Sequence, residues 1–315
     1  MKKILVFLLL ILWPSMVLAG RYLLEAEIIL QKTPARLVEV WVPLPLEDET
    51  QKVEQLIVKA PGPYLITRED EYGNRFLYLR LKGEPARITY QAVVRRKEFS
   101  PRPASTPPPL RLLLPDRLVP VETFRDLALE LTKEAKTPRE KLFALYDFVV
   151  TNLRYDKSGQ GWGRGDALFA CKAKRGNCTD FHSLLMALSR AVGIPSLFEI
   201  GLPVPEGGGK ISGYHCWLKV YLDGKILGLD ASEAAKHPEK KTYFFGHLCD
   251  RRILLTRGRD LLLSPAQHGP RLNFMYQAYA ERDLKPAPSL VHTTYRVKFL
   301  PDEAEDSRPP SAPGP

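Results

Sequence analysis

The sequence predicts an α+β protein in which an all-β region precedes helices that pack on an antiparallel sheet. Three observations predict this class. Between Tyr22 and Phe99, short runs rich in β-branched and aromatic residues alternate with turn residues. From Glu122 onward, apolar residues recur instead with a period near 3.6. After Gly193 strand-like runs return, and two of them flank an Asp-Gly pair, which is a strong signal for a β-hairpin.

The N-terminus has the layout of a secretory signal peptide. Lys2 and Lys3 precede an apolar run from Ile4 to Leu12. Ala19, before Gly20, is a small residue of the kind found at a signal-peptide cleavage site. We therefore expect a cleavable signal peptide over residues 1–19 and a secreted or periplasmic protein. The apolar run is shorter than the ~20 residues of a membrane-spanning helix, so an uncleaved N-terminal anchor is the less favoured alternative.

The charge distribution argues against a nucleic-acid partner. The chain carries 46 Lys and Arg against 36 Asp and Glu, for a net charge of +10. These basic residues are scattered along the sequence, whereas a nucleic-acid site needs a concentrated basic stripe. The charge supports at most a loose association with anionic cell-envelope surfaces.

The four cysteines are too few for a disulfide framework in a chain of 315 residues. They are Cys171, Cys178, Cys216 and Cys249. Export to an oxidising compartment leaves a pairing of Cys171 with Cys249 open.

Composition divides the chain after the signal peptide. Residues 20–99 predict a small β-sandwich domain, and the proline-rich residues 100–115 predict a stiff linker. Residues 116–283 hold the helical pattern and the later strands. Residues 284–315 are rich in proline and polar residues and predict a largely disordered tail, although residues 291–299 (VHTTYRVKF) suit one more strand.

Three helices are predicted in the second domain. One apolar stripe covers residues 124–135, and another follows Thr137 and Pro138, a cap residue with proline at the first helical position. A third helix begins near Cys178 and ends at Gly193.

The Asp-Gly hairpin brings a histidine and an aspartate together. With Asp223 and Gly224 as the two turn residues, Trp217 lies opposite Asp230. His215 is two residues from Trp217, so it lies on the same face and is the diagonal neighbour of Asp230. That spacing lets the carboxylate accept a hydrogen bond from the imidazole, whereas a slip of one residue would separate them.

Cys178 lies at the predicted start of a helix. Unpaired N–H groups and the helix dipole stabilise a thiolate there, and the same N–H groups can stabilise an oxyanion. With His215 as base and Asp230 as its orienting acid, Cys178 suits the nucleophile of covalent catalysis. The alternatives for this thiol are a small core residue, half of a disulfide or, least favoured, a metal ligand.

Four motifs in this order resemble the core of the transglutaminase-like superfamily. They are GNCTDF at 176–181, AVGIP at 191–195, HCW at 215–217 and LDAS at 229–232. The resemblance covers roughly residues 120–260 of this chain. It also extends to the preceding β region, because many bacterial members carry a β-sandwich before the core.

The resemblance implies a papain-like fold with a catalytic triad at Cys178, His215 and Asp230. It implies an enzyme that acts on peptide or carboxamide bonds through a thioester, with no cofactor and no metal. Hydrolysis, as in a peptidase or amidase, is favoured over crosslinking acyl transfer by analogy with bacterial members. The alternative is a non-catalytic envelope binding or scaffold module that retains the fold.

Three further residues are weaker candidates for the oxyanion hole or the substrate cleft. Asn177 either assists the oxyanion hole or provides turn geometry. Trp162 lies in a glycine-rich segment, residues 155–176, and an upstream tryptophan lines the cleft in some relatives of the superfamily. Trp217 directly follows the His-Cys pair.

Two other side chains near the triad are predicted to have structural roles. Cys216 alternates with apolar residues, which places it in the core on the face away from His215. His182 follows Cys178 by one helical turn and is expected on the helix surface, with a zinc pair of these two residues as a minor alternative.

Overall fold

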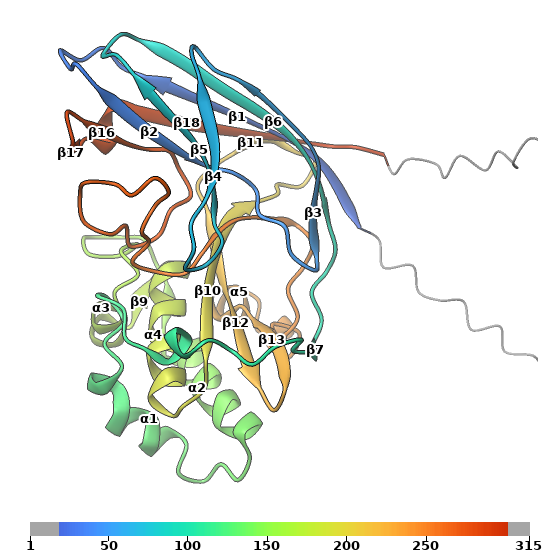
Figure 1. The fold of residues 1–315 in the computed structure, drawn as a ribbon. Helices are drawn as coiled ribbons and strands as arrows, with labels where there is room; N and C mark the ends of the chain where they lie inside the picture. Colours follow the sequence, from blue (N-terminus) through green and yellow to red (C-terminus); the bar gives the residue numbers. More distant parts are fainter. Residues whose placement is uncertain (1–18, 302–315) are drawn as a thin grey trace, which may run out of the picture.

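The structure is a computed structural model that describes residues 19–301. A β domain lies above a second domain in which helices pack against a sheet (Figure 1). This arrangement confirms the predicted α+β class, with a β domain ahead of the helix-and-sheet core. The first 18 residues of the predicted signal peptide and the end of the predicted tail, residues 302–315, lie outside the described residues.

The β domain is a sandwich of two antiparallel sheets with strand orders β11-β18-β1-β6-β3 and β17-β16-β2-β5-β4. Its strands are β1 Gly20–Leu30, β2 Val38–Pro43, β3 Gln51–Lys59, β4 Tyr64–Arg68, β5 Arg75–Leu81, β6 Ala86–Arg96, β11 Gly209–Ile211, β16 Tyr279–Arg282, β17 Lys285–Pro286 and β18 Val291–Phe299. Alternate residues of facing strands, such as Leu24, Val40 and Leu79, are buried between the sheets. The period-2 pattern of the sequence therefore marks the inner face of the sandwich.

Residues 284–301 belong to this β domain rather than to a separate tail. β18 pairs with β1 along its whole length, from Tyr22 opposite Phe299 to Leu30 opposite Val291. β18 is the strand that the sequence suggested for residues 291–299, which is confirmed. The prediction of a largely disordered tail is wrong for residues 284–301. The physical reason is the strand edge, because β1 without β18 would leave one side of its backbone unpaired.

The second domain packs helices on a sheet of order β14-β13-β12-β10-β15. Its helices are α1 Arg125–Leu131, α2 Pro138–Asn152, α3 Ala167–Ala173, α4 Cys178–Ala191 and α5 Ala231–Lys236. Its strands are β7 Arg102–Pro103, β8 Arg154–Tyr155, β9 Arg175–Gly176, β10 Ser196–Pro203, β12 His215–Leu222, β13 Lys225–Leu229, β14 Phe245–Gly246 and β15 Arg252–Arg257. Short 3-10 turns complete the described chain: η1 Leu110–Leu113, η2 Glu122–Phe124, η3 Pro238–Lys240 and η4 Pro288–Leu290.

The predicted linker packs against the second domain. Within residues 100–115, β7 pairs with β13, and η1 buries Leu112. The segment therefore extends the sheet of the second domain.

Helix α4 is the centre of the second domain. Helix α4 begins at Cys178 and ends before Gly193, as predicted. The earlier helix α2 also begins as predicted, at Pro138, with a full capping box at Thr137. Every residue of α4 is buried, because the sheet, α2, α3 and α5 surround it. A helix buried on all sides places its first residue, Cys178, in the interior.

The β12–β13 hairpin has the predicted register. Leu218 lies opposite Leu229 and Leu222 opposite Lys225. The turn residues Asp223 and Gly224 have φ values of 49° and 70°, as a type I′ turn requires. No helix within residues 19–301 has the length and apolar content needed to cross a membrane.

Candidate active site

The cap of α4 presents Cys178. The Asn177 side chain accepts a hydrogen bond from Thr179 N at 3.0 Å, and the Asp180 carboxylate accepts one from Asn177 N at 3.0 Å. This capping box starts the helix directly at Cys178. The N–H of Cys178 has no acceptor among residues 19–301 and stays available at the positive end of the helix dipole.

The structure brings Cys178, His215 and Asp230 together from three elements. His215, the first residue of β12, donates from Nε2 to Asp230 Oδ2 at 2.7 Å. This bond leaves the other ring nitrogen, Nδ1, free for the Cys178 thiol, which lies close enough to His215 for each group to shift the pKa of the other. The register of the hairpin therefore places base and orienting acid as the sequence predicts, and the start of α4 supplies the thiol.

The electrostatics of these groups favour an ion pair. Burial opposes charge on His215, yet the adjacent Asp230 carboxylate raises its pKa to about 10. Burial likewise opposes a Cys178 thiolate, but hydrogen bonds from Cys216 and His215 hold its pKa well below the usual range of a thiol. At neutral pH the site therefore contains a thiolate beside an imidazolium, the reactive form of a cysteine nucleophile.

Asp230 is held by four donors. Its Oδ1 accepts from Ser232 Oγ at 3.1 Å and from Glu233 N at 3.0 Å, which caps α5. Its Oδ2 accepts from Arg252 Nη1 at 3.1 Å in addition to His215. Although burial opposes its charge, His215 and then Arg252 keep the Asp230 pKa well below its usual range. Asp230 is thus a fixed anion behind His215.

Arg252 is a member of the site that sequence reasoning missed. It is 2% exposed, and its Nη2 also donates to Cys249 Sγ at 3.1 Å. Its only sequence signal is the pair Arg251-Arg252 before an apolar run, and that pattern does not distinguish the buried arginine from the exposed one.

His182 lies under the site, so its predicted surface position is wrong. Its Nε2 accepts from Ala231 N at 3.1 Å, and its Nδ1 lies 2.8 Å from the Cys178 carbonyl oxygen. These partners require the neutral ring with its proton on Nδ1, and burial lowers the His182 pKa in agreement. His182 therefore ties the first turn of α4 to the start of α5.

Cys216 is buried in the core, as predicted, but on the side that faces α4. Its Sγ lies 3.4 Å from His182 Nδ1, and burial together with the neighbouring Cys178 raises the pKa of the Cys216 thiol. The alternation rule located the core face correctly. It did not reveal that the nucleophile helix covers that face.

The weaker cleft candidates lie elsewhere or are occupied. Trp217 lies on the His215 face of β12, with its ring 6.1 Å from the His215 ring, but it is fully buried and its indole N–H donates to Glu199 Oε2 at 2.6 Å. The Asn177 amide is used by the cap and by Tyr214 Oη, 2.8 Å from its Nδ2. Trp162 donates from its indole N–H to Gly159 O at 3.1 Å. No hydrogen bond joins Trp162 to Cys178 within residues 19–301. None of the three presents a free donor to the thiol.

The glycine-rich loop before α3 is held next to the site. Asp180 accepts from Gly163 N at 2.7 Å and from Gly165 N at 3.0 Å. From the other side, the buried Arg259 donates to Gly165 O at 2.8 Å and to Ser183 Oγ at 2.6 Å. The loop is therefore fixed by residues of α4 and by the chain after β15.

All four cysteines of the chain lie within the described residues and are free thiols. The pairing of Cys171 with Cys249 that the sequence left open is therefore not formed.

The fold and the site define a papain-like α+β core that carries a cysteine, a histidine and an aspartate in contact. Residues 125–231 match the family model of the transglutaminase-like superfamily. This segment is therefore similar to a transglutaminase-like core, in agreement with the resemblance drawn from its motifs.

Two relatives match nearly the whole chain. A Haemophilus influenzae protein without an assigned function is 24% identical over 331 residues, which cover 87% of this chain and 88% of the relative. A crystal structure from Cytophaga hutchinsonii, provisionally assigned as a cysteine protease, has 15% identity and a TM-score of 0.57, and covers 90% of this chain and 98% of its own. This second relative shares the fold of both domains.

A third structure is more distant. The periplasmic domain of TgpA from Pseudomonas aeruginosa aligns over 73% of this chain and 92% of its own, with 14% identity and a TM-score of 0.36. That score is too low to show a common fold.

Proposed function

We propose that this chain is an exported cysteine enzyme that cleaves peptide or carboxamide bonds through a thioester intermediate. The observation that carries the proposal is the hydrogen bond of His215 Nε2 to Asp230 at 2.7 Å, beside a buried Cys178 whose pKa the same histidine lowers. This arrangement of nucleophile, base and orienting acid is the one that acyl transfer needs.

In the first half-reaction, the Cys178 thiolate attacks the substrate carbonyl carbon. The free N–H of Cys178 at the start of α4 stabilises the developing oxyanion. The His215 imidazolium gives its proton to the departing amine as the C–N bond breaks. The products are the free amine and a thioester on Cys178.

In the second half-reaction, water attacks the thioester. His215 Nδ1, now neutral, takes a proton from the water, and Asp230 stabilises the imidazolium that forms again. The C–S bond breaks, which releases the carboxylic acid and restores the thiolate–imidazolium pair. An amine in place of water would give crosslinking. Hydrolysis is favoured by analogy with the Cytophaga relative, which is provisionally assigned as a cysteine protease.

The cellular setting follows from the sequence. The signal-peptide pattern of residues 1–19 supports a secreted or periplasmic location with a peptide or protein substrate. The scattered positive charge supports loose contact with an anionic envelope and no nucleic-acid partner.

One observation favours the alternative of a non-catalytic scaffold. Cys178 is only 1% exposed. Burial raises the pKa of the nearby Tyr214 and Tyr276, and the charge of Cys178 raises the pKa of both further. A substrate carbonyl can reach a sulfur this deeply buried only when the side chains around it move. A scaffold would have no need of that access.

Two measurements on the full protein separate enzyme from scaffold. Mass spectrometry of iodoacetamide labelling at pH 7 compares Cys178 with Cys171, a thiol on α3 whose pKa is raised by burial. Incubation with a peptide pool and a fluorescent primary amine then counts new peptide termini, released ammonia and incorporated amine. We expect faster labelling of Cys178 and new termini or ammonia that Cys178→Ala abolishes and Cys171→Ala retains. Equal labelling, together with no product formation by the parent protein above that of Cys178→Ala, would establish the scaffold.

A further inference from the structure

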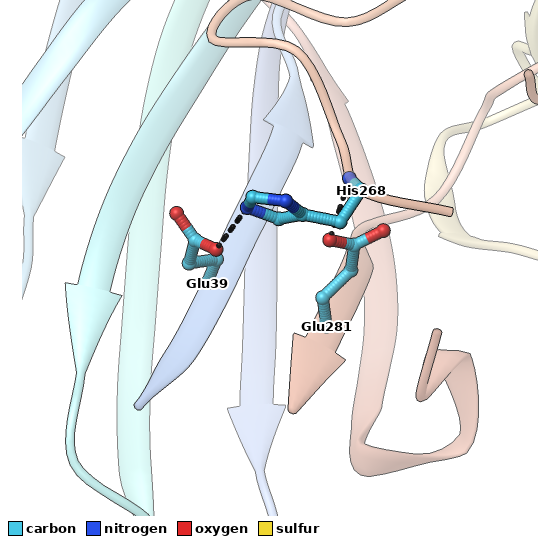
Figure 2. A group of neighbouring side chains, drawn as sticks. All are labelled: Glu39, His268 and Glu281. Carbon is cyan, nitrogen blue, oxygen red and sulfur yellow. Dashed lines mark hydrogen bonds and ion pairs between the residues drawn. The ribbon is translucent and has the colours of Figure 1, made fainter. Parts of the chain in front are cut away.

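A second cluster of chemically capable side chains lies in the β domain, away from Cys178. Glu39 on β2 and Glu281 on β16 are direct cross-strand partners, so their side chains share one face of the sheet. His268, in the segment between β15 and β16, lies over them (Figure 2). One possible ligand atom from each of these three residues lies within 4.8 Å of the others.

The two carboxylates need a cation. The side chains of Glu39 and Glu281 are buried, and like charges directly opposite each other on a sheet repel. One positive side chain, Arg80, lies 3.5 Å from Glu39 Oε1, but Arg80 is 63% exposed. An excess of negative charge therefore remains at the buried end of the cluster.

Neighbouring donors bind one oxygen of each carboxylate, Glu39 Oε1 and Glu281 Oε1, and leave the other two oxygens with lone pairs for a further partner. Tyr78 donates to Glu39 Oε1, and the Glu281 Oε1 atom accepts from Gly269 N at 2.7 Å and from Tyr279 Oη at 2.9 Å. Glu281 Oε2 accepts only from His268 N, at 2.9 Å. Since each carboxylate oxygen has two lone pairs, Glu281 Oε2 keeps one for a further partner.

The decisive atom is Glu39 Oε2. It is buried and accepts no hydrogen bond from any residue between 19 and 301, although His268 Nε2 lies 3.3 Å away. A nitrogen and an oxygen at this distance without hydrogen-bond geometry are arranged like two ligands of one ion. With metal–ligand bonds of about 2.0–2.2 Å, neighbouring ligands of a tetrahedral ion lie roughly 3.3–3.5 Å apart.

We propose that Glu39, His268 and Glu281 bind a divalent transition-metal ion such as Zn²⁺. An imidazole and two carboxylates suit zinc, and the exposure of His268 leaves a fourth position for water. This site is independent of the acyl-transfer chemistry proposed for Cys178.

The ion would fasten the segment of residues 258–278 to the β domain. The same segment contacts the active-site loop, because Arg259 donates to Gly165 O and Asn273 donates from Nδ2 to Arg164 O at 2.6 Å. Its apolar residues Leu261 and Met275 pack on Trp41 of β2. Metal binding at His268 thus stabilises a segment that joins the two domains.

Zinc binding to the tag-free full chain tests the proposal. The measurement is equilibrium dialysis against buffered Zn²⁺ in a Cys178→Ser background, which removes the other thiolate–imidazole pair that zinc could use. We expect one Zn²⁺ per chain, and affinity reduced at least tenfold by His268→Asn, as for the loss of a metal ligand. The matched control is His292→Asn, an exposed histidine on β18, which should bind as the parent does.

A second readout covers the buried ligands. Because His268 is exposed, His268→Asn should fold, whereas Glu39→Gln or Glu281→Gln could fail to fold. Zn²⁺ should slow amide hydrogen exchange in residues 258–278 of the parent and not in His268→Asn. Equal zinc affinity in His268→Asn, or no zinc uptake at micromolar Zn²⁺, would overturn the proposal and leave His268 as a polar neighbour of Glu39.

Discussion

Arg252 and Asp230 form a buried ion pair directly behind the His215 imidazole. Arg252 Nη1 donates to Asp230 Oδ2 at 3.1 Å, the same oxygen that accepts from His215 Nε2 at 2.7 Å. Arg252 is also stacked on Trp217, with its guanidinium carbon 4.9 Å from the ring centroid. The arginine therefore positions the carboxylate that positions the base, and it touches no reacting atom.

Arg252→Met should destabilise the protein and weaken the site. Removing one partner of a buried ion pair costs about 3–5 kcal/mol, because Asp230 would keep a buried charge with less compensation. Urea unfolding measures the loss. Arg251→Met is the matched control, since Arg251 is exposed, and it should change the free energy of unfolding by no more than ~0.5 kcal/mol. Equal stability of the two variants would contradict the positioning role of Arg252.

The labelling rate of Cys178 should be nearly independent of pH between 6 and 8. The Cys178 pKa lies well below its usual range, and the His215 pKa is raised to about 10, so the ion pair persists across this interval. The rate should fall as pH drops through the Cys178 pKa, because the thiolate is protonated there. Turnover should fall as pH rises through about 10, because His215 then loses the proton that the leaving amine needs. Iodoacetamide kinetics and peptide turnover measure the two limbs.

His215→Gln provides the comparison for that profile. Without the imidazolium, the labelling rate should rise about tenfold per pH unit up to the pKa of an ordinary thiol, ~8.5. A flat profile in this variant would show that Cys216 and the helix dipole suffice to form the thiolate, against the ion pair described above.

Asp230→Asn should lower turnover by more than its loss of stability explains, although Arg252 also loses its buried charge partner. Asn is as good a helix cap as Asp, so the start of α5 is retained and the stability loss from the cap should be small. The neutral amide no longer stabilises the His215 imidazolium, and in serine proteases the equivalent change lowers kcat by about 10⁴. We expect a loss of peptide turnover of at least a hundredfold. Asp223→Asn, in the exposed hairpin turn, should retain full turnover.

Asp180→Ala should loosen the glycine-rich loop. Three backbone N–H groups, those of Gly163, Gly165 and Asn177, lose their acceptor, and each buried donor left unsatisfied costs about 1–3 kcal/mol. Hydrogen exchange at Gly163 and Gly165 should accelerate, and Cys178 labelling should change with it. Asp126→Ala, at an exposed position of α1, should leave both measurements as in the parent.

Tyr295→Ala should show that β18 is part of the β-domain core. Tyr295 is 4% exposed and donates to Tyr276 O at 2.8 Å. Truncation of a large buried aromatic costs about 3–5 kcal/mol. The neighbouring Arg296 points outward, so Arg296→Ala should have little effect on the melting temperature. A small effect of Tyr295→Ala would instead favour a peripheral tail, as the sequence suggested for residues 284–315.

The sequence by itself determined the elements that depend on neighbouring residues. Asp223 and Gly224 set the hairpin register, and that register aligns His215 with Asp230. The Asn177 cap starts α4 at Cys178. Turn chemistry, caps and periodicity act over a few residues, so their signals are readable along the chain.

Only the tertiary structure decided which surface covers which. It placed Arg252 on Asp230, packed Cys216 against His182 of α4, and gave the buried Trp217 indole N–H to Glu199. It also closed the β domain with β18, whose partner β1 lies at the other end of the chain. A strand or helix pattern specifies which face is buried. The identity of the covering element depends on packing between residues far apart in sequence, and no local pattern records it.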